Sequence, residues 1–83
     1  MRVTPDEVRN RIAEALPGAR VEVRSDDNVH FAALVVAPQF DGRRTMQRHQ
    51  MVYAALGAAV GREIHALSLE TPTPGEWAQR AGG

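Results

Sequence analysis

The sequence has 83 residues, with ten arginines, no lysine, ten acidic residues and no cysteine. A chain of this length forms one domain, residues 1–83, and buries roughly 60–65% of the surface that its unfolded state exposes. Without cysteine, disulfides are excluded, and so is a thiolate of this chain as nucleophile or metal ligand. The formal net charge of zero excludes a broad electrostatic attraction to nucleic acid or anionic lipid.

Targeting and catalytic patterns do not stand out in the sequence. The amino-terminal segment lacks the apolar run of a signal peptide, and no stretch approaches the ~20 apolar residues of a membrane span. We therefore expect a cytoplasmic protein with no membrane partner. No Ser–His–Asp, paired-carboxylate or phosphate-loop arrangement rises above chance, so we expect no enzyme and no catalytic residues.

The first expected element is a helix in "TPDEVRNRIAEALPG", residues 4–18. Thr4 suits the N-cap and Pro5 suits the first helical position, and the Pro-Gly pair at the end stops the helix. Apolar residues recur every four positions and form one stripe. The members of this stripe are Val8, Ile12 and Leu16.

Two strands are expected next, in "ARVEVRS" (residues 19–25) and "HFAALVVA" (residues 30–37). The first alternates valine with charged residues, which is typical of a half-exposed strand. The second is apolar on both faces, which indicates a central strand. The short turn "SDDN" between them makes the two strands antiparallel.

A long helix and a third strand follow. "RRTMQRHQMVYAALGAAVG", residues 43–61, predicts the helix, and its start, in "DGRRTMQ", can form a separate short turn. "EIHALSLE", residues 63–70, predicts the strand. Because a helical crossover joins it to the second strand, we expect the two strands to be parallel with a right-handed connection.

The last expected element is a short helix in "TPTPGEWAQRA", residues 71–81. Thr73 suits the N-cap, Pro74 the first position and Glu76 the capping box. Trp77 is its expected anchor. The order of elements predicts a two-layer α+β domain, with a small mixed three-stranded sheet and helices on one face.

Residues 40–77, "FDGRRTMQRHQMVYAALGAAVGREIHALSLETPTPGEW", resemble the BolA family. The shared features are an F-x-G turn, RH followed by VY and L on the long helix, then IHAL and TP-x-EW. His30–Phe31 resembles the subgroup with histidine in place of cysteine in that loop. The resemblance implies a fold akin to the type II KH domain, αββααβ with a short C-terminal helix.

The resemblance also implies two functions. One is a heterodimer with a monothiol glutaredoxin around a shared, bridged 2Fe–2S cluster, in iron–sulfur cluster trafficking or iron regulation. The alternative is a DNA-binding transcriptional regulator. The resemblance further implies that the thiolate ligands come from the glutaredoxin and from glutathione, since this chain has no cysteine. We therefore expect that the isolated chain does not hold the cluster.

Two histidines are the candidate metal ligands. On residues alone, His65 on an apolar strand face is most simply a core or edge histidine, and His30 an exposed loop histidine. With the resemblance, His65 matches the family's ligand histidine, and imidazole is a known ligand of 2Fe–2S iron. If the second and third strands are parallel neighbours, His30 and His65 lie at the same end of the sheet.

Three further residues have plainer interpretations. His49 shares a helix stripe with Val52 and Leu56, so we interpret it as a packing or hydrogen-bonding group and not as a ligand. Asp26 and Asp27 are ordinary turn formers. The alternative is that one of them orients an imidazole, but no feature of the sequence supports it.

Arg43, Arg44 and Arg48 form the only basic cluster in the sequence. Their plain interpretation is a solvated helix start; the alternative is a contact surface for DNA phosphates or an acidic partner. The GxxG loop with which KH domains grip RNA is missing, since three residues separate Gly57 from Gly61. We therefore place the glutaredoxin partnership first and DNA binding second.

Overall fold

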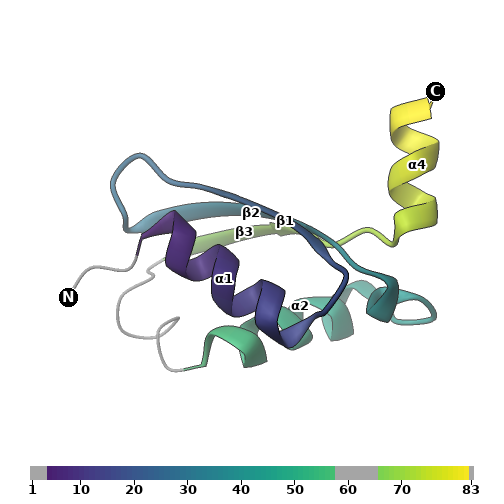
Figure 1. The fold of residues 1–83 in the computed structure, drawn as a ribbon, viewed down its shortest axis with the longest axis horizontal. Coiled ribbons are helices and arrows are strands. Elements are labelled where there is room, and N and C mark those ends of the chain that lie inside the picture. Colours follow the sequence, from purple (N-terminus) through teal and green to yellow (C-terminus); the bar gives the residue numbers. More distant parts are fainter. Residues whose placement is uncertain (1–3, 58–65, 83) are drawn as a thin grey trace.

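Three α-helices, one short 3-10 helix and a three-stranded sheet make up residues 4–57 and 66–82, the part of the chain that the computed structural model describes (Figure 1). The elements are α1 (Pro5–Ala15), β1 (Arg20–Arg24), β2 (His30–Val36), η1 (Pro38–Phe40), α2 (Thr45–Leu56), β3 (Ala66–Glu70) and α4 (Pro74–Gly82). The predicted α+β class and the order of elements are confirmed. No helix in these two ranges is long and apolar enough to cross a membrane.

Helix α1 begins as its sequence predicts. The Thr4 hydroxyl accepts a hydrogen bond from the Glu7 backbone N–H at 3.3 Å, and Pro5 is the first helical residue. The predicted stripe enters the core: Val8 and Ile12 are fully buried and Leu16 is nearly so. These side chains pack with residues of β2 and α2 in one apolar cluster, which fixes α1 against the sheet.

The sheet has the predicted mixed topology, with β2 in the centre. β1 pairs with β2 in the antiparallel sense, and β3 pairs with β2 in the parallel sense. Helices α1 and α2 lie on the same side of this sheet (Figure 1). The parallel pairing brings the beginnings of β2 and β3 to one end of the sheet, which is the arrangement that the candidate site requires.

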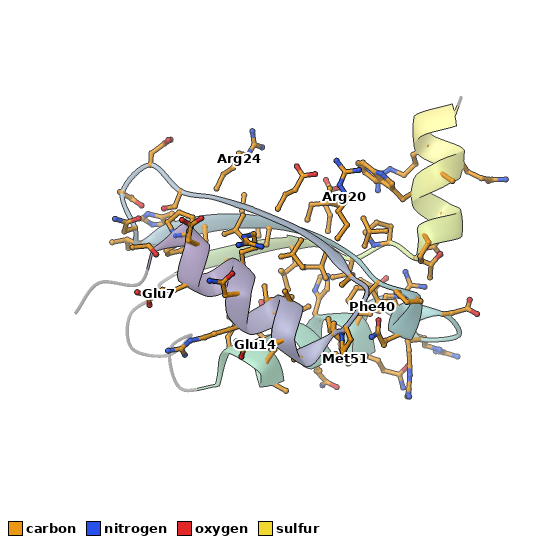
Figure 2. The ribbon with its side chains drawn as sticks, viewed as in Figure 1. Glu7, Glu14, Arg20, Arg24, Phe40 and Met51 are labelled. Carbon is orange, nitrogen blue, oxygen red and sulfur yellow. The ribbon has the colours of Figure 1, made fainter. Side chains whose placement is uncertain are left out.

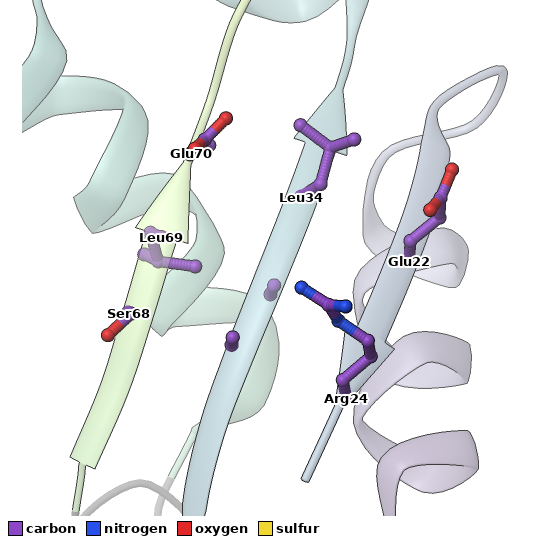
Figure 3. Close-up of a pocket in the computed structure, with 8 residues that line it drawn as sticks. Glu22, Arg24, Leu34, Ser68, Leu69 and Glu70 are labelled. Atoms are coloured by element: carbon purple, nitrogen blue, oxygen red, sulfur yellow. The ribbon is translucent and has the colours of Figure 1, made fainter.

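The prediction that β2 is the central strand is confirmed. At the beginning of β2, exposed His30 and Ala32 alternate with buried Phe31 and Ala33, whereas Val35 and Val36 are both buried at its end. The face of the sheet opposite the helices is open beside Ala32, and Figure 3 shows polar side chains of the flanking strands there, Glu22 and Arg24 of β1 and Ser68 and Glu70 of β3. A two-layer fold covers the sheet with helices on one side only. The uncovered side can carry alanine because exposing its small side chain to water costs little free energy.

Helix α2 is shorter than predicted at both ends. The chain forms a 3-10 turn at Pro38–Phe40, before the region where we expected a separate turn, and α2 itself starts at Thr45. It ends at Leu56 because Gly57 takes a φ of +62° as C-cap, a conformation that glycine adopts at little cost. Residues 58–65, which contain the expected end of this helix and the expected start of the third strand, lie outside the described residues.

Helix α4 stands at the end of the sheet remote from the β1–β2 loop (Figure 1). Its predicted capping box is complete: the Glu76 N–H donates to the Thr73 hydroxyl at 3.1 Å, and the Thr73 N–H donates to Glu76 Oε1 at 2.9 Å. The half-buried Trp77 ring lies 5.3 Å from the Arg80 guanidinium and 6.0 Å from that of Arg20. Arg20, which Figure 2 shows beside α4, belongs to β1. Trp77 therefore connects α4 to the sheet.

Candidate functional site

The loop between β1 and β2 is held by side chains that bind its own backbone. Asp27 Oδ1 accepts hydrogen bonds from the N–H groups of Val29 and His30, both at 2.9 Å. Ser25 Oγ accepts from the Asn28 N–H at 2.9 Å and donates to the His30 carbonyl at 2.7 Å. Asn28 has a φ of +58°, a left-handed conformation that asparagine tolerates better than most residues. The loop therefore presents His30 from a defined backbone.

The same aspartate also holds the His30 ring. Asp27 Oδ2 lies 2.8 Å from His30 Nδ1, and the two side chains are 52% and 68% exposed. The hydrogen bond from the ring, with those from the backbone of His30 and Val29, holds the pKa of Asp27 well below its usual range. Asp27 is thus more than a turn former: it fixes the direction of the imidazole. The described residues give Nε2 of that ring no hydrogen-bond partner.

The strand register bears on the second predicted ligand. His30 pairs with Ala66, the first residue of β3 and the residue that follows His65 in the sequence. His65 itself lies outside the described residues, so the convergence of the two histidines stays a prediction. Within residues 4–57 and 66–82, no group of three or more His, Cys, Asp or Glu could hold a metal ion. Any ligand set completed around His30 therefore needs donors from outside these ranges.

His49 lies far along the sheet from His30. It is half-buried on α2 and lines a hollow with Leu69 and Glu70, at the end of β3, whereas His30 pairs with the beginning of that strand. The structure therefore does not bring His49 and His30 together.

Arg48 is committed to contacts within the fold. Its side chain is only 13% exposed, and the guanidinium donates to three groups. Nε donates to the Arg43 carbonyl at 2.9 Å and Nη1 to the Thr71 carbonyl at 2.9 Å. Nη1 and Nη2 also donate to Glu76, at 2.7 and 3.3 Å. These bonds connect α2 to the segment that leads into α4.

The basic cluster of the sequence is thus divided. The hydrogen bonds from Arg48, and then that from the Thr73 N–H, lower the pKa of Glu76 to about 2, so this carboxylate stays charged opposite Arg48. Arg43 and Arg44 are exposed on the segment before α2. The contact between Arg48 and Glu76 spans 28 residues, and no local sequence signal identifies it.

The fold is that of a small α+β domain, and its exposed histidine is held in one orientation by Asp27. Residues 8–76 match the family model described as "BolA-like protein". The chain belongs to the BolA-like family, as its motifs predicted.

Three relatives illustrate the match. Human "BolA-like protein 1" is 31% identical over 83 residues, which cover 89% of this chain and 61% of the relative. The "DNA-binding transcriptional regulator BolA" of Escherichia coli is 32% identical and covers 84% of this chain and 79% of its own. The structure of a BolA homologue from Coxiella burnetii superposes with a TM-score of 0.79 at 41% identity, over 90% of this chain and 96% of that one. The chain spans about three-fifths of the length of the mammalian relatives it matches.

Proposed function

We propose that the protein is a non-catalytic partner of a monothiol glutaredoxin, and that the two proteins share a bridged 2Fe–2S cluster in iron–sulfur cluster trafficking or iron regulation. His30 and His65 are the ligands from this chain. The observation that carries the proposal is the exposed His30 ring, whose Nδ1 is held by Asp27 at 2.8 Å while Nε2 faces no described partner.

This arrangement has the features of a histidine that binds metal. Histidine ligands nearly always donate their second ring N–H to a carboxylate, a backbone carbonyl or water, which fixes the ring and makes the ligating nitrogen more basic. Asp27 supplies that carboxylate for His30. The parallel register places Ala66, the residue that follows His65 in the sequence, opposite His30 at the same end of the sheet.

The donor set suits a shared cluster better than one held by this chain alone. A 2Fe–2S centre takes four outer ligands, and two histidines on one iron with two thiolates on the other is known chemistry. This chain has no cysteine, so the thiolates come from the glutaredoxin and from glutathione. When bound, the cluster supplies iron and sulfide that can be passed on.

Visible spectra of the assembled complex test this proposal. The chain is mixed with a monothiol glutaredoxin, glutathione, iron and sulfide, and wild type is compared with His30→Ala and His65→Ala. Each variant should change the cluster spectrum, His65→Ala more strongly because the His30 loop can admit another donor. His49→Ala is the matched control and should keep the spectrum while lowering thermal stability. If both ligand variants leave the spectrum unchanged, the proposal is wrong.

The second candidate is a DNA-binding transcriptional regulator. The name of the Escherichia coli relative favours it, and so do the exposed side chains of Arg43 and Arg44 before α2, since arginines contact phosphates. Titrating labelled duplex DNA with wild type and with the double variant Arg43→Ala, Arg44→Ala tests it. Equal binding by the two proteins would exclude this surface as the DNA contact.

A further inference from the structure

We propose that Asp27 is the positioning residue for iron binding by His30: its carboxylate selects the ring tautomer that carries hydrogen on Nδ1 and so leaves the Nε2 lone pair for iron. Only the claim that Nε2 binds iron rests on the proposed function. The choice of tautomer is a property of this chain by itself.

The hydrogen bonds of Asp27 divide between its two oxygens. Oδ1 accepts from the backbone N–H groups of Val29 and His30, and Oδ2 faces His30 Nδ1 at 2.8 Å. A charged carboxylate can only accept hydrogen bonds, and a neutral imidazole has one donor and one acceptor nitrogen. Nδ1 must therefore be the donor, which makes Nε2 the nitrogen with a free lone pair.

Little else in the described residues can set the ring. His30 is 68% exposed, so packing constrains it weakly. Its backbone is held on both sides, since its N–H donates to Asp27 and its carbonyl accepts from Ser25 Oγ at 2.7 Å. The ring itself has one described hydrogen-bond partner, Asp27 Oδ2. The neighbouring carboxylate, Asp26, is exposed and forms no described hydrogen bond with this ring.

Asp27→Asn should reverse the tautomer and keep the loop. An amide nitrogen cannot accept hydrogen bonds, so the amide oxygen must stay at the Oδ1 position, where it accepts from Val29 and His30. The NH₂ group then occupies the Oδ2 position and donates to Nδ1. The ring hydrogen moves to Nε2, which then has no free lone pair with which to bind iron. The aspartate-to-asparagine change in the serine protease triad acts through a wrong tautomer in the same way.

The first experiment uses the chain alone, labelled with ¹⁵N at histidine, at a pH where the imidazole is neutral. Long-range proton–nitrogen spectra should show wild-type His30 with hydrogen on Nδ1, and Asp27→Asn should exchange the signatures of the two ring nitrogens. Asp26→Asn removes the same charge one residue away and should match wild type. A wild-type ring with hydrogen on Nε2, or a tautomer unchanged by Asp27→Asn, would overturn the proposal. Backbone amide spectra check that the loop keeps its fold.

The second experiment assembles the cluster with a monothiol glutaredoxin and glutathione. Asp27→Asn should reproduce the change caused by His30→Ala, and combining the two substitutions should add nothing. Asp26→Asn should again match wild type. If Asp27→Asn alters the complex further when His30 is already alanine, Asp27 acts by another route and the proposal is wrong. If the tautomer reverses while His30→Ala itself leaves the spectrum unchanged, the failure lies in the ligand role of His30, not in the control of its ring by Asp27.

Discussion

Arg48→Met tests whether this arginine supports the fold or contacts a ligand. Methionine keeps most of the aliphatic stem and removes the guanidinium. That group donates to the Thr71 carbonyl, to the Arg43 carbonyl and to both oxygens of Glu76. Thr71 is 8% exposed, so water cannot readily replace the donor that its carbonyl loses.

The magnitude follows from the part-buried bond to Thr71. A hydrogen bond that involves a charged group contributes about 1.5–3 kcal/mol. Counting that bond alone, and assigning nothing to the exposed contacts, we expect the free energy of unfolding to fall by about 1.5–3 kcal/mol. In a domain of this size, 1 kcal/mol corresponds to roughly 4–8 °C. Tm should therefore fall by roughly 6–24 °C.

Thermal unfolding followed by circular dichroism measures this change. Arg44→Met is the matched control, because Arg44 is exposed and surface substitutions usually change stability by less than about 0.5 kcal/mol. If both variants have the same Tm, or if Arg48→Met loses DNA or partner binding without losing stability, the assignment of a structural role to Arg48 is wrong. A triple alanine variant that includes Arg48 would confuse unfolding with loss of contact, so the double variant of Arg43 and Arg44 is the cleaner test of DNA binding.

Three further outcomes are expected. Reconstituting the isolated chain with iron and sulfide should give no stable cluster, because two imidazoles cannot complete four outer ligands; a stoichiometric cluster without added thiol would contradict this. DNA binding should be weak, with a slope of log affinity against log salt no steeper than about −2, since each phosphate contact contributes about −0.9 and Arg43 and Arg44 are the exposed members of the arginine cluster; a steeper slope would reveal cations outside this pair. Because folding lowers the pKa of Glu76 from 4.5 to about 2, its contact with Arg48 stabilises the fold fully above about pH 4.5 and is lost as the pH falls through 2. The fluorescence of Trp77, the single tryptophan, should report the release of α4 over that interval, and Glu76→Gln should remove this acid transition; unchanged fluorescence down to pH 2 would refute the linkage.

Local patterns predicted most of the fold. The caps at Thr4 and Thr73 act over three residues, and the stripe of α1 repeats every four, so neither depends on distant parts of the chain. The mixed sheet followed from connection lengths, because a short turn joins antiparallel strands and a helical crossover joins parallel ones. The motifs also identified the family correctly.

The site was predicted only in part. His30 was singled out, but its bond to Asp27 depends on a loop in which Asn28 turns left-handed and Ser25 binds the backbone at both sides. Asp26 and Asp27 are equivalent as turn formers in the sequence, and only the folded loop distinguishes them. His65, the other predicted ligand, lies outside the described residues and stays a prediction.

The sequence by itself determined the order of elements, the pairing of strands and the family, because these depend on short-range periodicity and on motifs. Tertiary structure alone decided which carboxylate meets which cation. Arg43, Arg44 and Arg48 look alike in the sequence, yet only the last reaches across 28 residues to Glu76. A side chain that is attached to a rigid helix finds its partner through the packing of α2 against the sheet, and that packing is a property of the whole chain.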